Sequence, residues 1–213
     1  MREASRSTVG RRVASGRVRT ARVVRRTRET AVDLALRLDG MGKPPVVMTP
    51  LPFLNHMLTL TAAHAGFDLV LRATGDTDVD DHHLVEDAGI ALGQALLRAL
   101  GDRRGIRRYA DATVPMDESL VQCALDLSGR PLLAYGLRPS ARRIKAFDTQ
   151  LVREFFEGFV RDARCTLHLR QLTRGGHAHH EVEGAFKAFG RALGTAVERT
   201  GRFKGVPSTK GSL

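Results

Sequence analysis

Apolar residues recur every three to four positions in four segments of the chain, residues 52–64, 88–101, 150–163 and 184–197. This period predicts four amphipathic helices. Apolar and polar residues alternate instead in residues 30–40, 67–75, 119–129 and 165–173, and a further apolar run covers residues 131–139. A period of two predicts β-strands that bury one face.

The order of these predicted elements occurs twice. The helix at 150–163 follows the helix at 52–64 by 98 positions, and the strands and second helices recur at a similar spacing. Strand, strand, helix, strand, helix is therefore expected over about residues 26–110 and again over 111–200. This pattern predicts an α+β fold of duplicated half-domains, each a small β-sheet covered by helices on one face, packed into one unit.

Positive charge is concentrated at the start of the chain. Of the formal net charge of +11, residues 1–26 contribute +8, from nine arginines and one acidic residue. Few large apolar residues accompany them, so residues 1–25 are predicted to form a disordered Arg-rich tail. The chain has no apolar stretch of membrane-spanning length, and Cys123 and Cys165 have no CxxC context. We therefore expect a cytoplasmic protein with reduced cysteines.

One motif, His-His-x-x-Glu, is present in both halves, 97 positions apart. Its members are His82, His83 and Glu86, then His179, His180 and Glu183. Spacings of three and four bring side chains to one face of a helix, and imidazoles with a carboxylate suit zinc, manganese or iron. The upstream helices add one donor each, His56 and Glu154. Shared between two ions, about four protein ligands each would leave positions open for substrate, as in catalytic sites.

Several basic residues are candidates for binding a dianionic group such as phosphate. They are Arg108, Arg130, Lys187 and the terminal segment 207–211. Arginine forks, lysine and hydroxyl donors suit phosphate oxygens. His64 and His168 alternate with apolar neighbours, which favours packed or supporting roles, and His177 lies in a Gly-rich turn. The sequence contains no P-loop, GxGxxG or nucleophile elbow, which argues against a nucleotide ligand and covalent catalysis.

Nine segments in this order resemble imidazoleglycerol-phosphate dehydratases of histidine biosynthesis. They read RTRET, PFLNHML, DDHHLVED, GIALGQAL, DLSGRP, FDTQLVREFF, TLHLRQL, HHEVEGAFKAFGRAL and PSTKG, and they run from about residue 26 to the C-terminus. The resemblance implies a dehydratase domain over residues 26–213, of the ribosomal protein S5 domain 2-like fold, with a C-terminal substrate-binding tail. It also implies two Mn²⁺ ions per active site and a large symmetric homo-oligomer whose metal sites are completed between subunits.

Carried onto this sequence, the resemblance implies three groups of site residues. The metal ligands would be His56, His82, His83, Glu86, Glu154, His179, His180 and Glu183; family members have His or Glu at the position of Glu154. The substrate contacts would be Glu29, His56, His64, Arg108, Arg130, Lys187, Ser208, Thr209 and Lys210. The catalytic carboxylates would be Glu29, Glu86 and Glu183. The implied reaction removes water from D-erythro-imidazole-glycerol phosphate to give imidazole-acetol phosphate.

The chain departs from the family pattern at four positions. Pro50, Asn55, Leu84 and His177 stand where relatives usually have Gly, Asp, Thr and Asn. Changes near metal ligands commonly alter affinity or activity by about 10- to 100-fold. Three alternatives therefore stay open: a metal-binding relative with altered or lost activity, a metal hydrolase, and a nucleic-acid-binding protein that uses the Arg-rich tail. The nearly neutral body of the chain argues against the last.

Overall fold

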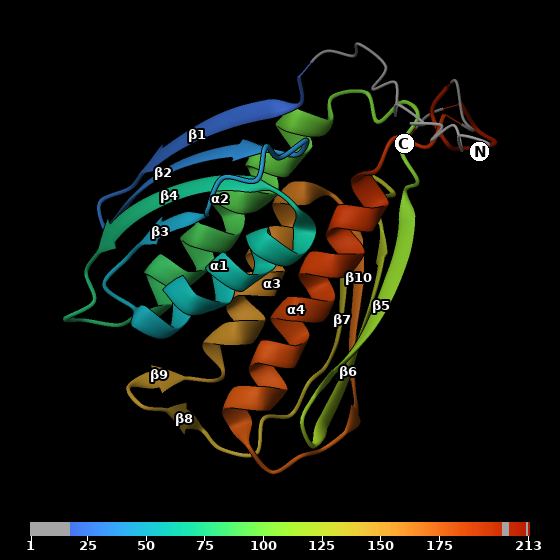
Figure 1. Ribbon diagram of the computed structural model, residues 1–213. Coiled ribbons are helices and arrows are strands. Elements are labelled where there is room, and N and C mark those ends of the chain that lie inside the picture. The colour runs from blue at the N-terminus through green and yellow to red at the C-terminus, as the bar shows by residue number, and fades with distance from the viewer. Residues whose placement is uncertain (1–17, 202–204, 212) are drawn as a thin grey trace, which may run out of the picture.

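The computed structural model describes residues 18–201, 205–211 and 213 of the chain. Two four-stranded sheets lie on either side of a layer of helices (Figure 1). The first half contains β1 (Thr20–Arg26), β2 (Thr30–Arg37), β3 (Val46–Met48), α1 (Pro52–Ala65), β4 (Asp68–Gly75) and α2 (His82–Leu100). The second contains β5 (Tyr109–Met116), β6 (Ser119–Asp126), β7 (Leu132–Gly136), β8 (Arg143–Ile144), β9 (Phe147–Asp148), α3 (Leu151–Ala163), β10 (Thr166–Thr173) and α4 (Ala178–Val197).

The two sheets have the same topology. Their strand orders are β1-β2-β4-β3 and β5-β6-β10-β7, and β8 and β9 form a separate small hairpin. In each four-stranded sheet the last pairing is parallel and the other two are antiparallel. Helix α1 then corresponds to α3, and α2 to α4. The predicted α+β fold of duplicated half-domains is confirmed.

The core lies between the helices and the inner faces of the sheets. Strands β2 and β6 alternate strictly between buried and half-buried residues, and α2 and α4 cover their buried faces. The largest fully buried side chains include five phenylalanines of α3 and α4: Phe155, Phe156, Phe159, Phe186 and Phe189. Each such side chain stabilises the fold by about 1.5–3 kcal/mol relative to an exposed one.

The helices pack across the two halves, α1 against α4 and α2 against α3. Glycines make these crossings close: a Cβ at Gly89 would lie 2.2 Å from the carbonyl oxygen of Phe155, and one at Gly190 would lie 2.6 Å from that of Thr61. In Figure 1 the four helices begin toward the same end of the molecule. The His-His-x-x-Glu motifs, which open α2 and α4, are therefore brought to that end.

The prediction of a disordered tail over residues 1–25 is wrong for its last part. Residues 20–26 form β1, which pairs with β2 along its whole length, and the side chain of Val23 is buried in the core. Arginines are common on the exposed face of this strand. Their charge makes the segment resemble the residues before it, so the sequence did not predict its alternation of buried and exposed side chains. Residues 1–17 lie outside the described residues. Strand β5 was also not predicted, so each four-stranded sheet has one more strand than expected, and the β8–β9 hairpin was not predicted either.

Proline and glycine set the limits of α1. Pro52 occupies the first turn, where its missing N–H costs nothing, and Gly66 ends the helix with a left-handed φ of 70°. In the part of the chain that the structure describes, no helix is both long enough and apolar enough to cross a membrane.

Candidate metal centre and phosphate-binding residues

The two histidines of each motif point in different directions, because neighbouring residues on a helix are about 100° apart. In the second motif, Nε2 of His179 lies 3.0 Å from Oε2 of Glu183, one helical turn further on. His180 faces the β5–β6 turn instead, where its Nδ1 lies 3.1 Å from both carboxylate oxygens of Glu118. A single ion therefore cannot easily take both histidines of one pair.

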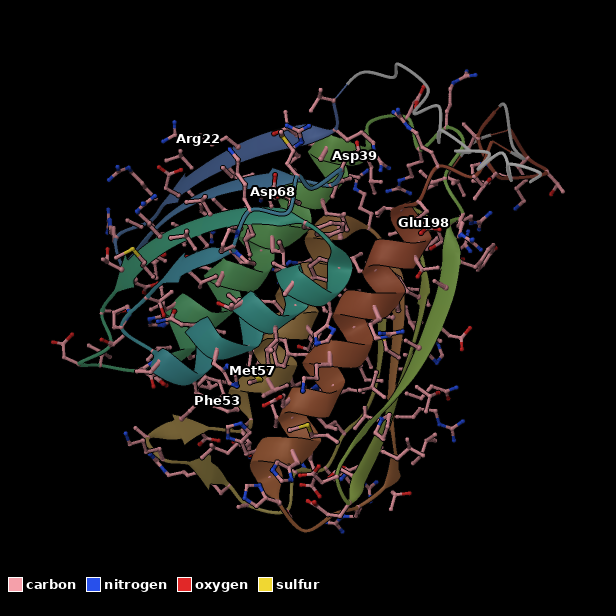
Figure 2. All side chains as sticks on the ribbon, viewed as in Figure 1. Arg22, Asp39, Phe53, Met57, Asp68 and Glu198 are labelled. Carbon is pink, nitrogen blue, oxygen red and sulfur yellow. The ribbon has the colours of Figure 1, made fainter. Side chains whose placement is uncertain are left out.

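Helix α1 completes a compact donor group around the second motif. Nε2 of His56 lies 3.2 Å from Oε2 of Glu183, and donor atoms of His56, His179 and Glu183 all lie within 4.8 Å of one another. Phe53, labelled in Figure 2 at the start of α1, packs its ring edge-on against that of His179. The arrangement brings together two imidazoles and one carboxylate from two helices.

The Glu183 carboxylate is nearly buried, with 7% of its side chain exposed. Burial raises the pKa of Glu183, but hydrogen bonds from Lys187, His179 and His56 outweigh it, so the pKa lies below its ordinary value. Nζ of Lys187 lies 2.5 Å from Oε1 of Glu183. The carboxylate is thus held ionised, which is the form that binds a metal.

The first motif is arranged more loosely. Nε2 of His82 lies 3.9 Å from Oε2 of Glu86, and Arg161 of α3 donates a hydrogen bond of 3.2 Å to Oε1 of Glu86. Helix α3 passes directly beside this glutamate, since a Cβ at Gly158 would lie 2.8 Å from its backbone oxygen. Glu154, one turn before Gly158, is half-buried.

Each upstream donor therefore lies on the side of the other half's motif and not of its own. The sequence predicted His56 beside the first motif and Glu154 beside the second. The structure places His56 against the second motif, and it places α3, which carries Glu154, against the first. The reason is that each half packs its first helix on the second helix of the other half.

Two carboxylates that the sequence did not predict at the site, those of Asp76 and Glu118, face the second histidine of each pair. Nδ1 of His83 lies 3.1 and 3.2 Å from the carboxylate oxygens of Asp76, and 3.9 Å from Oε2 of Glu29. The hydrogen bond to Asp76 raises the pKa of His83 above its ordinary value. Asp76 and Glu118 lie in loops, and only the pairing of the strands brings them to the histidines.

The donor set fits a transition metal. Donor atoms of neighbouring ligands 3.0–3.2 Å apart, as in the group of His56, His179 and Glu183, suit an ion about 2.0–2.2 Å from each. Imidazole and carboxylate together favour manganese, iron or zinc over calcium. Three protein ligands would leave open positions for substrate.

Several of the predicted phosphate-binding residues gather at another place. Arg108, which is buried, donates a hydrogen bond of 2.8 Å to Asp126, and Arg130 lies 3.7 Å from the same carboxylate. Arg108 also donates to the carbonyl oxygen of Pro207 at 2.8 Å, which holds the segment of Ser208, Thr209 and Lys210 beside it. Lys187 and His64 do not belong to this group. They lie along α4 and α1, where burial and the charge of Lys187 lower the pKa of His64.

The predicted phosphate-binding group lies at the opposite end of α4 from the compact donor group. The backbone N–H of Arg108 bonds to the carbonyl oxygen of Ala196 in the last turn, whereas His179 lies in the first. Twenty helical residues span about 30 Å. Figure 2 labels Glu198, just after α4, far from Phe53. One chain therefore does not bring both groups to a single small substrate.

The four departures from the family pattern have different surroundings. The Asn55 amide donates to the carbonyl oxygen of Thr49 at 3.0 Å and accepts from its N–H and hydroxyl at 3.0 and 2.8 Å, and the structure shows no hydrogen bond from Asn55 to His56 among the described residues. Leu84 is fully buried in the core, and Pro50 is exposed. The ring of His177 stacks on that of His180, with centroids 4.1 Å apart.

Comparison with known proteins gives one family throughout. A family model for imidazoleglycerol-phosphate dehydratase matches residues 49–193. The dehydratases of Aromatoleum aromaticum and Cellvibrio japonicus are 55% and 52% identical over 197 and 196 residues, which is 92% of this chain and 100% and 98% of theirs. The crystal structure of the Staphylococcus aureus dehydratase superposes with a TM-score of 0.77 at 41% identity, over 85% of this chain and 99% of that one. That of the Pyrococcus furiosus enzyme in complex with (S)-C348 gives 0.78 at 37%, over 90% and 100%. The chain therefore belongs to the imidazoleglycerol-phosphate dehydratase family, whose members are hydro-lyases.

Proposed function

We propose that this chain removes water from D-erythro-imidazole-glycerol phosphate to give imidazole-acetol phosphate, a step of L-histidine biosynthesis, and that it depends on Mn²⁺. Membership of the dehydratase family supports the reaction. The single structural observation that carries the metal requirement is the group of His56, His179 and Glu183, with its donor atoms within 4.8 Å of one another.

Each active site would hold two ions on this proposal. His56, His179 and Glu183 would bind one, and His82, Glu86 and Glu154 would bind the other. When bound, the ions would act as Lewis acids toward the substrate imidazole and fix its orientation. His83 and His180 point away from these groups, so they would serve the sites of neighbouring copies.

Glu29 is the residue best placed to move protons. Its carboxylate is 54% exposed, lies 3.9 Å from Nδ1 of His83, and makes no hydrogen bond among the residues that the structure describes. A free carboxylate beside the metal-binding histidines is suited to take a proton from the substrate carbon and to protonate the departing hydroxyl. Glu86 and Glu183 are each paired with a basic side chain, which favours ligand roles for both.

The separation of the two groups along α4 supports assembly. A substrate with an imidazole at one end and a phosphate at the other spans far less than about 30 Å, the length of this helix. We therefore propose a homo-oligomer in which a neighbouring copy supplies Arg108, Arg130, Ser208 and Lys210 to the phosphate. Arg108 and Arg130 flank Asp126, which accepts hydrogen bonds from Arg108 and lies 3.7 Å from the guanidinium group of Arg130.

The deciding experiment is a dehydratase assay on purified, metal-stripped protein with and without added Mn²⁺, together with its mass in solution. We expect Mn²⁺-dependent formation of imidazole-acetol phosphate by a large particle. A protein that binds two Mn²⁺ per chain but forms no product would support the alternative of a relative with lost activity. A shortened chain that begins at residue 18 keeps β1 intact and should retain activity. Loss of activity together with loss of salt-sensitive nucleic-acid binding would favour a role for the tail.

A further inference from the structure

The second histidine of each pair is held by a carboxylate through the same ring nitrogen. Nδ1 of His83 lies 3.1 Å from Oδ2 of Asp76, and Nδ1 of His180 lies 3.1 Å from Oε1 of Glu118. The two carboxylates come from different places in the fold. Asp76 follows β4, whereas Glu118 lies in the turn between β5 and β6.

A neutral imidazole carries its proton on one nitrogen and a lone pair on the other. A carboxylate that accepts from Nδ1–H keeps the proton there, fixes the plane of the ring and leaves Nε2 free to bind a metal. We propose that Asp76 and Glu118 are positioning residues that fix Nε2 of His83 and His180 as their metal-binding nitrogens. This inference rests on the proposed function, because it takes both histidines as manganese ligands.

The two halves supply the carboxylate that faces Nδ1 from different loops, and the sequence shows the reason. The residue that follows β10, where Asp76 follows β4, is Arg174, which has no side-chain acceptor. The β5–β6 turn supplies Glu118 instead. In the first half Asp76 occupies Nδ1 of His83, so Glu29 of the β1–β2 turn stays 3.9 Å away. Because Asp76 fills the place at Nδ1 of His83 that Glu118 fills at His180, Glu29 stays available for proton transfer.

The ring of His180 is also fixed from one face. The ring of His177 stacks on it at a centroid distance of 4.1 Å and an interplanar angle of 20°. Stacking limits tilting of the ring but does not select a nitrogen. Selection of the nitrogen is left to Glu118, so its removal is expected to act even with the stack intact.

The test compares Mn²⁺ binding to the full chain and to Glu118→Ala and Glu118→Gln, with free Mn²⁺ measured by its electron paramagnetic resonance signal. Glutamine keeps an oxygen that accepts from Nδ1–H, whereas alanine does not. We expect Glu118→Ala to weaken one class of sites about 10- to 100-fold, and Glu118→Gln to recover most of that loss. Asp76→Ala and Asp76→Asn should behave alike at the first motif.

Asp117→Asn is the matched control. Asp117 lies in the same turn, its carboxylate is 74% exposed, and its Oδ2 is 3.8 Å from Nδ1 of His180, beyond hydrogen-bonding distance. The Asp117→Asn variant removes one negative charge from the turn, as Glu118→Gln does, and should leave Mn²⁺ affinity unchanged. If Glu118→Gln and Glu118→Ala weakened Mn²⁺ binding equally, the carboxylate would itself be a ligand, and the positioning role would be overturned. The positioning role would also be overturned if neither variant weakened Mn²⁺ binding. A wild-type chain that binds no Mn²⁺ would overturn the proposed function, and the positioning role with it.

Discussion

The two halves of the chain share one framework but surround their His-His-x-x-Glu motifs with different side chains. Where α1 meets α4, His56 and Lys187 flank Glu183. Where α2 meets α3, Arg161 flanks Glu86, and Glu154 stands in α3 at the position that His56 takes in α1. The packing of helices therefore fixes where donors lie, while the identity of each donor has diverged.

This divergence makes the two sites unequal. Around the second motif the Nε2 atoms of His179 and His56 lie 3.0 and 3.2 Å from Oε2 of Glu183, and only 7% of the glutamate side chain is exposed. Around the first motif the corresponding distance from His82 to Glu86 is 3.9 Å, and 31% of the glutamate is exposed. A buried, preformed group needs less reorganisation on binding. We therefore expect tighter Mn²⁺ binding at the second motif.

The largest expected effect comes from removing the first histidine of either motif. His179→Ala and His82→Ala should each lower turnover about 10³-fold, because a catalytic metal ion contributes several kcal/mol and each 1.4 kcal/mol is a factor of ten. Mn²⁺ titration should show that His179→Ala loses the tighter class of site and His82→Ala the weaker one. If His82→Ala kept full turnover, the first motif would not belong to the catalytic site.

A second comparison uses two arginines at equivalent positions, Arg19 before β1 and Arg108 before β5. Arg19 forms an ion pair with Asp39, and Arg108 forms one with Asp126. Both aspartates come after the hairpin turn that follows the arginine. We expect Arg108→Gln to raise KM about 10- to 100-fold, the loss of one charged hydrogen bond of about 1.5–3 kcal/mol to phosphate. Arg19→Gln should leave KM unchanged and lower the free energy of unfolding. A raised KM for both would place Arg19 in the substrate site.

The helix crossings can be compared by adding one methyl group to each. Gly89→Ala places a Cβ 2.2 Å from a Phe155 backbone oxygen, and Gly190→Ala places one 2.6 Å from that of Thr61. Both should destabilise the fold by about 1–3 kcal/mol, Gly89→Ala more than Gly190→Ala, in urea unfolding. Gly184→Ala is the control, since the atoms nearest its added Cβ belong to side chains and not to backbone, Val121 at 3.3 Å and Met116 at 3.8 Å. A neutral Gly89→Ala would mean that α2 and α3 are not in close contact.

The sequence alone predicted much of the fold, because hydrophobic period and duplication are local signals. The four helices, the strands β2, β4, β6, β7 and β10, and both histidine motifs followed from spacing. Strand β1 did not, since Arg22, Arg25 and Arg26 made it resemble the disordered segment before it. The exchange of His56 and Glu154 between motifs also escaped prediction, because it depends on which helices pack together. For the same reason the contacts of Asp76 and Glu118 needed three-dimensional structure.

The Arg19–Asp39 pair of the first half predicts a pH dependence of stability. The hydrogen bond from Arg19 holds the pKa of Asp39 below its ordinary value, despite the opposing effect of burial. A lowered folded-state pKa stabilises the protein above the unfolded value of about 3.9, and this contribution is lost as the pH falls through the folded value. The difference in unfolding free energy between wild type and Asp39→Asn should therefore shrink as the pH falls from about 5 to about 3. A difference that stays constant would show that the ion pair contributes nothing.

The smallest expected effect is that of Asn55→Asp, which restores the residue usual in the family. The change removes the amide donation to the Thr49 carbonyl oxygen and places a charge beside that oxygen, while the start of α1 partly compensates by favouring negative charge. The net loss of stability should stay below about 1 kcal/mol. Arg153→Gln, which breaks the Arg153–Glu157 pair at the equivalent place in α3, is the control and should cost no more than about 0.5 kcal/mol. Because Asn55 faces Thr49, Mn²⁺ affinity and kcat should not change in either variant. A change in Mn²⁺ affinity for Asn55→Asp alone would show that this position acts on His56, and that the first turn of α1 tunes the site in one half only.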